Sequence, residues 1–382
     1  MSRLGLVRPR SLFYAEPVRT FGVEEELLLV DADSGSIKAC VDEVLGGLAG
    51  QRDPAGIRLV SELQREQLEV ITPVHSDLGE LAEDIVAGRA LADALAVGAG
   101  ARAAALATPV LPFVPHLSAV PRVGAMEERF GLTAREQLTC ACHVHVGVES
   151  GDEGVAVLDR IRSWLPVLSA LSANSPFWQG RDTGYASYRI QSLGRWPMAG
   201  PAGIYGSLGA YRRRLQALLD TEVPLDEAML YLDARLSRSY PTVEIRVADV
   251  CLYPDDAVLI AALSRALVET AARQWRAAVP PADVPTAVLR LANWRASRSG
   301  IGGDLLHPLS GVPRPAGEVL DALMAHLAPA LADNGDGPQV EALLKQVMHR
   351  GTGAEFQRRT LEQTGTLAGV VKGALAATHR QA

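Results

Sequence analysis

The chain has 382 residues, of which 48% are hydrophobic and 21% charged, a balance typical of a globular protein and unlike that of a disordered one. The net charge of −7 gives no reason to expect a nucleic-acid-binding protein, which would need a basic patch or stripe. Only Lys38, Lys345 and Lys372 are lysines, and none completes a Gly-x-x-x-x-Gly-Lys-Ser/Thr loop, so a P-loop nucleotide site is excluded.

In chain order, the first predicted elements are extended. A strand is expected over 20–31, and a second extended stretch covers 57–72. Asp77, with Glu80 three residues later, resembles a capping box that begins a helix. Apolar residues then follow helical spacing, and we expect this helix to continue to about Ala107, where Thr-Pro ends it.

The middle of the chain predicts a central strand over 138–148 and a helix over 152–172. Residues 174–204 are rich in Gly, Pro, Ser, Arg and aromatic residues without a clear period, so they predict a long loop. Loops of that length within a compact domain are usually functional. A helix over 207–220 precedes a strand over 240–250, and most of the chain beyond is helical.

Three of these strands place ionisable side chains at alternating positions within an apolar sequence. Successive side chains of a strand point to opposite faces, so residues two positions apart share a face. The opposite face then carries apolar residues such as Val23, Val144 and Ile245. The polar face is therefore interpreted as the floor of a site for metal ions and phosphate. The three pairs on it are Glu24 with Glu26, His143 with His145, and Glu244 with Arg246.

Two carboxylates on one strand face repel each other unless a cation or protons lie between them. The alternative is that Glu24 and Glu26 lie on a solvent-exposed face of the sheet. The other residues on that face are Gly22, Leu28 and Val30, which are not the polar residues expected on an exposed surface. This favours metal binding. Hard oxygen ligands with a single imidazole suit Mg²⁺, or Mn²⁺, better than zinc.

The other two pairs each allow a second interpretation. His143 and His145 could be structural, or could belong to a zinc-dependent amidohydrolase. Arg246 is placed to offset the charge that develops in phosphoryl transfer. Glu244 and Arg246 could equally form a simple ion pair on one face.

The segment 61–70 supplies further carboxylates. Glu69 lies in its β-like part and is the preferred metal ligand there. Glu62 is seven residues earlier, a spacing that one regular strand cannot bring to the same face. Its participation requires a bend, a bulge or a helical stretch.

The sequence predicts a cytoplasmic protein with one α+β domain over 18–375, preceded by a tail over 1–17. The first twenty residues hold no apolar stretch long enough for a secretory signal, and no run of about eighteen apolar residues predicts a membrane span. We expect one domain because the proposed site draws on strands from 20 to 250. The cysteines lack Cys-x-x-Cys spacing and are interpreted as reduced packing residues: Cys40, Cys140, Cys142 and Cys251.

Several of these segments resemble the YbdK-type carboxylate-amine ligases, a group similar to the bacterial glutamate–cysteine ligases and more distantly to glutamine synthetase. The resemblance runs from about residue 18 to about residue 360 in the family's order. Its motifs are Phe21-Gly22-Val23-Glu24-Glu25-Glu26, Gln67-Leu68-Glu69-Val70, Cys142-His143-Val144-His145-Val146-Gly147, Ser172-Ala173-Asn174-Ser175-Pro176-Phe177-Trp178, Gly180-Arg181-Asp182-Thr183-Gly184-Tyr185 and Gly351-Thr352-Gly353-Ala354.

The resemblance implies a curved antiparallel sheet that forms a funnel flanked by helices, with ATP and an amino-acid carboxylate entering from opposite ends. It also implies about two or three Mg²⁺ ions and a homodimer. The matching metal ligands are Glu24, Glu26, Glu69, His143 and Glu244, with Glu62 as a sixth. His145 and Arg246 match positions that contact ATP phosphates, Arg238 is a second phosphate or substrate clamp, and Asn174, Arg181 and Tyr185 are candidates to hold the carboxylate substrate.

Such an enzyme would join small-molecule substrates, most simply the γ-carboxylate of glutamate and the amine of cysteine, through an acyl phosphate. The general base stays unassigned, because strand alternation directs Glu25 to the apolar face. The competing hypotheses are the metal-dependent amidohydrolase that uses the His-x-His pair, and a ligand-binding protein that kept the fold and lost turnover.

Overall fold

A computed structural model describes residues 18–47 and 56–380, so the predicted tail over 1–17 lies outside the described residues. Within them, seven strands form one antiparallel sheet in the order β2-β3-β1-β5-β9-β8, with β4 also paired to β1. The strands of this sheet are β1 (Phe21–Asp31), β2 (Arg58–Ser61), β3 (Gln67–Ile71), β4 (Ala101–Ala104), β5 (Ala141–Gly147), β8 (Ala234–Leu236) and β9 (Thr242–Asp249).

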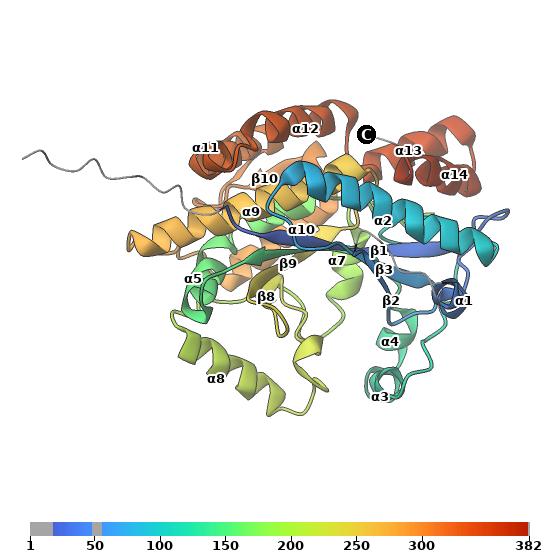
Figure 1. The fold of residues 1–382 in the computed structure, drawn as a ribbon, viewed down its shortest axis with the longest axis horizontal. Helices are drawn as coiled ribbons and strands as arrows, with labels where there is room; N and C mark the ends of the chain where they lie inside the picture. Colours follow the sequence, from blue (N-terminus) through green and yellow to red (C-terminus); the bar gives the residue numbers. More distant parts are fainter. Residues whose placement is uncertain (1–17, 48–55, 381–382) are drawn as a thin grey trace, which may run out of the picture.

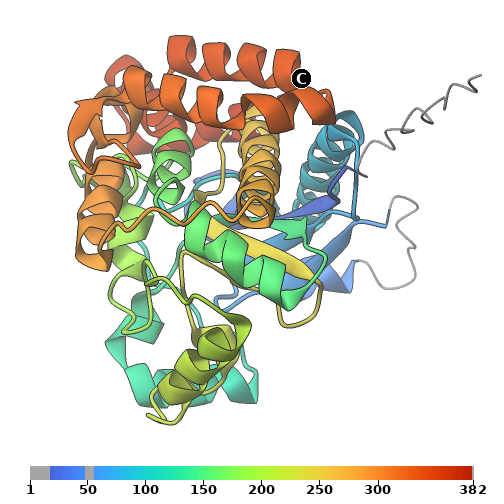
Figure 2. The ribbon, with the colours of Figure 1, turned by 90° about the vertical axis from the view of Figure 1, so that its left-hand side faces the viewer.

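Helices cover both sides of the sheet unequally. Figure 1 shows α2 and α9 on one side and α3, α4 and α8 on the other, and Figure 2 gives the same layers from the side. The helices are α1 (Val41–Gly46), α2 (Leu78–Gly98), α3 (Pro121–Phe130), α4 (Leu132–Glu136), α5 (Gly151–Ile161), α6 (Leu165–Leu171), α7 (Tyr188–Leu193), α8 (Leu208–Leu219), α9 (Pro254–Arg276), α10 (Thr286–Ser299), α11 (Ala316–Asn334), α12 (Gly337–Arg350), α13 (Gly353–Thr364) and α14 (Leu367–Thr378).

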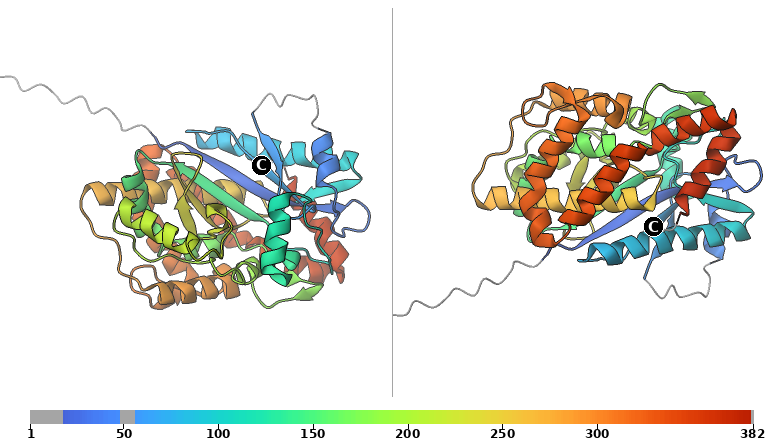
Figure 3. Two further views of the ribbon diagram at one scale, coloured as in Figure 1. Left: turned by 90° about the horizontal axis from the view of Figure 1, so that it is seen from below. Right: turned by 90° about the horizontal axis from the view of Figure 1, so that it is seen from above.

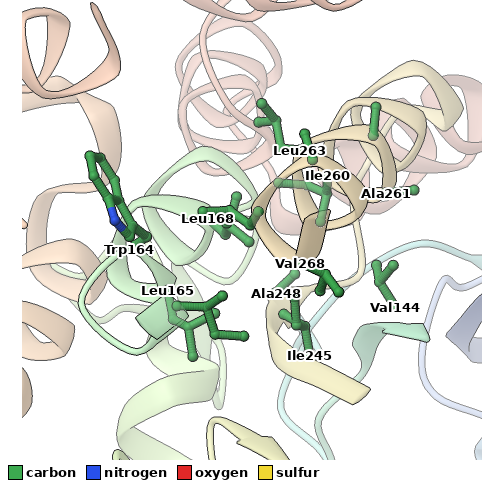
Figure 4. Close-up of a cluster of buried hydrophobic side chains, with 14 of the residues drawn as sticks. Val144, Trp164, Leu165, Leu168, Ile245, Ala248, Ile260, Ala261, Leu263 and Val268 are labelled. Carbon is green, nitrogen blue, oxygen red and sulfur yellow. The ribbon is translucent and has the colours of Figure 1, made fainter. Parts of the chain in front are cut away.

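The predicted alternation along the central strands is confirmed on the apolar face. Val144 of β5 and Ile245 of β9 are fully buried against residues of α6 and α9 such as Leu168 and Ile260. Figure 4 shows these side chains meeting between the sheet and the two helices. Burying this face leaves the opposite face of β1, β5 and β9 to the ionisable residues. The cysteines are all free and buried, as predicted.

Three element boundaries differ from the prediction. The helix that begins after Asp77 ends at Gly98, and the alanines that follow form β4 instead of extending the helix. Asp77 is the expected N-cap, since its side chain accepts a hydrogen bond from the Glu80 N–H at 3.0 Å. At the helix end, Gly100 has a φ of +65°, a conformation that favours glycine and turns the chain back into the sheet.

The helix predicted over 152–172 is two helices, α5 and α6, because Pro166 has no N–H to continue a helical ladder and instead lies in the first turn of α6. The predicted loop over 174–204 contains short elements of its own. These are the small ladder of β6 (Phe177–Trp178) with β7 (Arg181–Asp182), and helix α7. A second small ladder joins β10 (Asp304–Leu306) to β11 (Pro313–Pro315).

A buried ion pair lies behind the polar face of β1. Glu25 points into the apolar side, as predicted, where the guanidinium of Arg89 donates to both of its carboxylate oxygens at 2.9 and 2.6 Å. Arg89 also donates to the backbone carbonyls of Cys251 and Leu252, just before α9. One arginine thus connects β1 and α2 with the loop that follows β9.

We predict that Arg89→Met lowers the free energy of unfolding by about 3–5 kcal/mol, because it leaves the Glu25 carboxylate buried without a partner. Denaturant unfolding would measure this. Arg65→Met is the matched control, since Arg65 forms an exposed pair with Asp42 at 3.0 Å and should cost at most about 1 kcal/mol. Equal losses of unfolding free energy in the two variants would contradict a stabilising role for the buried Glu25–Arg89 pair.

Candidate active site

A cavity of about 890 Å³ opens on the polar face of the sheet. Figure 3 shows this face from below, where β1 and β5 are visible between α3 and α8, whereas helices cross the sheet when it is viewed from above. Nine of the residues predicted for the site line this one cavity: Glu24, Glu26, Glu62, Glu69, His143, His145, Arg238, Glu244 and Arg246.

The strand register explains why residues far apart in sequence meet here. Glu26 of β1 pairs directly with Glu69 of β3, and Glu24 pairs with His143 of β5. On the next strand, His145 pairs with Glu244 of β9. Directly opposite residues of an antiparallel pair have Cβ atoms roughly 4.5–5.5 Å apart, so the register forms a continuous row of ionisable groups across four strands.

Three groups of side chains bring their ligand atoms within 4.8 Å of one another, as a metal ion would require. The groups are Glu24 with Glu69 and His143, Glu24 with His145 and Glu244, and Glu26 with Glu62 and Glu69. Glu62 reaches its group because β2 and β3 form a hairpin, with Glu62 just after the end of β2. The spacing that one strand could not satisfy is therefore resolved by a turn.

Two of the acidic residues at this site, Glu62 and Glu69, are poorly compensated within the protein. Burial and the negative charge of Glu62 raise the pKa of Glu69 well above its usual range. Burial and the charge of Glu26 raise the pKa of Glu62 to about 8. Acidic groups that favour protons this strongly also favour a cation, because either one relieves the same repulsion.

Glu24 lies between the two histidines. Its carboxylate oxygens are 3.6 Å from His143 Nδ1 and 3.3 Å from His145 Nε2. Burial alone would raise the pKa of Glu24, but its interactions with the two imidazoles lower it well below its usual range. Burial and the charge of Arg246 lower the pKa of His143, so this imidazole is neutral near pH 7, the form that ligates metals.

Glu244 differs from the other predicted ligands because two arginines already hold it. Arg235 donates to both carboxylate oxygens, at 2.7 and 3.2 Å, and Arg246 donates to one of them. Burial would raise the pKa of Glu244, but these charges lower it to about 2. Arg235 was missed in the sequence, although Ala234-Arg235-Leu236 alternates like the other strands and pairs with β9.

The residues present fit a hard divalent cation. Carboxylates and one or two imidazoles are oxygen-rich donors of the kind that Mg²⁺ and Mn²⁺ take. His145 Nε2 is buried and lies 3.3 Å from a Glu24 oxygen without forming a hydrogen bond of normal geometry, while its Nδ1 lies 2.9 Å from the Thr242 hydroxyl. This ring nitrogen therefore has no strong hydrogen bond to lose when a cation or a phosphate group binds beside Glu24.

Arg238 also lines the cavity, from the turn between β8 and β9. Its guanidinium is exposed and 3.6 Å from the Glu227 carboxylate. Arg235 is the nearer of the two to the row of carboxylates. The structure therefore places Arg238 at the edge of the cavity and Arg235 on the sheet at its base.

The three residues predicted to hold the carboxylate substrate are not among those that line the cavity. The structure does not bring Asn174 to the cavity, because this residue is fully buried and donates to the backbone carbonyls of Ala105 and Val250 at 2.9 and 2.8 Å. Arg181 is exposed on β7. Tyr185 is half-buried and contacts Trp294, which does line the cavity, with ring centroids 6.5 Å apart.

Comparison with known proteins shows which family the chain belongs to. Residues 20–378 match the model of glutamate-cysteine ligase family 2. A protein of Paenarthrobacter aurescens (strain TC1) that bears the name glutamate–cysteine ligase 2-1 is 52% identical over 367 residues, which cover 95% of each chain.

Solved structures share the fold at low sequence identity. The glutamate–cysteine ligase of Francisella tularensis in complex with AMP is 12% identical, with a TM-score of 0.71 over 96% of this chain and 90% of that one. A bifunctional glutathione synthetase from Pasteurella multocida is 16% identical, with a TM-score of 0.68 over 94% of this chain and 52% of that one. None of the helices within residues 18–47 and 56–380 has the length and hydropathy needed to cross a bilayer.

Proposed function

The chain belongs to glutamate-cysteine ligase family 2, and on that premise we propose that its cavity binds ATP through divalent cations and joins a glutamate-like carboxylate to an amine. It is an ATP-dependent carboxylate-amine ligase of the glutamate–cysteine ligase type. The proposed nucleophile is the amine of cysteine or of a related compound. The amidohydrolase alternative finds no support in the family, the relatives or the fold neighbours.

The observation that carries the proposal is the convergence of six predicted metal ligands and Arg246 in one cavity, from four strands and a hairpin turn. A carboxylate and a triphosphate repel each other, so a site that unites them needs dense positive charge. Bound Mg²⁺ would neutralise phosphate oxygens and template the transfer. The predicted ligands are Glu24, Glu26, Glu62, Glu69, His143 and Glu244.

The chain's own residues would act on the reacting groups as follows. The guanidinium of Arg246 lines the cavity and would offset charge on the γ-phosphoryl group as the substrate carboxylate attacks it. Arg235 holds Glu244 and so fixes the orientation of the Glu244–Arg246 pair. Attack of the amine on the resulting acyl phosphate would then form the amide and release phosphate.

A coupled assay for ADP release tests the proposal. We expect release to require Mg²⁺, ATP, L-glutamate and an amine together, with one ADP per amide formed. A panel of amino acids and simple amines would identify the nucleophile. ADP release that needs no carboxylate, or amide cleavage without ATP, would contradict the proposal. Light scattering would test the predicted homodimer.

The raised pKa of Glu62 predicts a pH dependence for metal binding. Because burial and Glu26 raise the pKa of Glu62 to about 8, its carboxyl is mostly protonated near pH 7 in the metal-free protein. A cation must displace that proton, so the affinity for Mg²⁺ should rise between about pH 6 and about pH 8, by about tenfold per pH unit for each proton displaced. Calorimetric titration with Mg²⁺ measures this slope.

The matched variant is Glu62→Gln, which keeps the shape of the side chain and removes the titrating group. Its affinity should be lower and should vary less with pH. An unchanged slope in this variant would show that another group supplies the proton.

A further inference from the structure

Helix α10 presents one polar and aromatic face to the cavity. Arg290, Asn293 and Trp294 all line it, and their spacing of i, i+3 and i+4 puts them on one side of the helix. Trp294 is 47% exposed there, so its ring is available to a ligand. The metal row does not involve this face. The helix packs against α6 and α7, which fixes its position relative to β9.

Asn293 is a buried side chain with one unsatisfied atom. It is 9% exposed, and its Nδ2 donates to Asp233 Oδ2 at 2.8 Å. Its Oδ1 is buried without any hydrogen-bond partner. Asp233 also lines the cavity, and no described residue donates a hydrogen bond to its second oxygen. Asn293 Oδ1 is thus a buried acceptor without a donor, and the half-buried Asp233 carboxylate beside it is open to the cavity.

A buried acceptor without a donor, such as Asn293 Oδ1, destabilises the protein until a donor reaches it. A ligand that brings several N–H donors and a positive charge would satisfy both acceptors. Burial also raises the pKa of Asp233 to about 6, even with the hydrogen bond from Asn293 and the charges of Arg189 and Arg290 lowering it. The carboxylate is therefore ionised near pH 7 and incompletely compensated.

Arg290 supplies the opposite charge on the same face. It is exposed and forms no ion pair with any residue in the described part of the chain, although its charge acts on Asp233. Guanidinium groups bind carboxylates through paired N–H donors. The acceptors of Asn293 and Asp233 could bind an ammonium group, and the guanidinium of Arg290, about one helical turn from Asn293, could bind a carboxylate. An α-amino acid carries both of these groups on a single carbon.

This corner of the cavity adjoins the site of phosphoryl transfer. The backbone N–H of Arg246 donates to the carbonyl of Asp233 at 2.9 Å. Arg189, which lines the cavity, donates to the carbonyl of Arg246 at 3.1 Å. A molecule held by its head group at α10 would therefore direct its side chain toward Arg246 and the row of carboxylates.

We propose that Asp233 and Asn293 bind the α-ammonium group, and Arg290 the α-carboxylate, of the amino acid whose side-chain carboxylate is activated. The proposal rests on the ligase function above and deepens it. These three residues set specificity: the acid substrate must carry a free amino-acid head, and its analogues without an ammonium group are rejected. The dicarboxylic α-amino acids, such as L-glutamate and L-aspartate, fit this requirement.

Calorimetry on the full-length protein, saturated with Mg²⁺ and a non-hydrolysable ATP analogue, tests the assignment. Wild-type protein should bind L-glutamate at least about tenfold more tightly than glutarate or N-acetyl-L-glutamate, because both analogues lack the charged ammonium group that would donate to Asp233 and Asn293. Asp233→Asn and Arg290→Met should each weaken L-glutamate binding by about 10- to 100-fold and leave nucleotide affinity within about twofold.

Asp233→Asn should also abolish the discrimination between L-glutamate and glutarate, which a loss of folding would not do. Arg295→Met, on the same helix but away from the cavity lining, is the matched control and should bind like wild type. Equal affinity of wild-type protein for L-glutamate and glutarate, or unchanged L-glutamate binding in both variants, would overturn this assignment while nucleotide binding persists. Failure of the nucleotide to bind would instead contradict the ligase function on which it rests.

Discussion

Glu26→Gln is expected to lower the rate of ADP release by at least about a hundredfold, because the metal site loses a charged ligand that contributes several kcal/mol. Glu26 faces Glu69 across the β1–β3 pair and joins Glu62 in one group of ligand atoms. The amide oxygen of glutamine can still accept the hydrogen bond that the Ala141 N–H gives to Glu26 at 2.7 Å. The local backbone therefore keeps its partner.

Stability separates this effect from unfolding. Removing one of several crowded carboxylates relieves repulsion, so the melting temperature of metal-free Glu26→Gln should equal or exceed that of wild type. Glu83→Gln, exposed on α2, is the control and should keep full activity. Near-normal activity in Glu26→Gln, or a large loss of stability, would argue against a cation at this position.

Arg246→Lys tests the second main component of the site. The substitution keeps the positive charge but removes the planar guanidinium, which holds Glu244 and faces the cavity. Arginines that stabilise a transferring phosphoryl group contribute about 10³-fold or more to kcat. We expect a loss of that order in kcat, with a smaller change in the KM for ATP.

The expected pattern is specific to a transition-state role. Arg65→Lys, in an exposed pair and not among the residues that line the cavity, should leave both constants unchanged. If Arg246→Lys raised only the KM for ATP and left kcat intact, Arg246 would bind ATP in the ground state and would not stabilise the transfer.

The sequence predicted the site residues best where the alternation of side chains within a single strand was enough to place them. Alternation placed Glu24, Glu26, His143 and His145 on the face opposite Val23 and Val144, and the structure has them there. This works because a side-chain period of two is a local property. The pairing of distant strands, such as Glu26 with Glu69, is set by packing of the whole sheet and came only with the coordinates.

Prediction was weakest where the local sequence permits two structures. The alanines after Gly98 suit a helix as well as a strand, and only their pairing with β1 determines the outcome. Asn174 lies in a polar, glycine-containing segment that resembles a ligand loop, yet its amide satisfies buried backbone carbonyls. Arg290 and Asn293 lie on a helix whose cavity-facing side cannot be identified before the tertiary structure is known.

The central claim is that the row of carboxylates binds divalent cations that in turn hold the phosphates of ATP. A crystal structure with Mn²⁺ and a non-hydrolysable ATP analogue, using anomalous diffraction to locate manganese, tests it most directly. We predict anomalous peaks about 2.0–2.3 Å from carboxylate oxygens of Glu24, Glu26 and Glu69 and from the γ-phosphate. Nucleotide bound in the cavity with no manganese at these carboxylates would contradict the account.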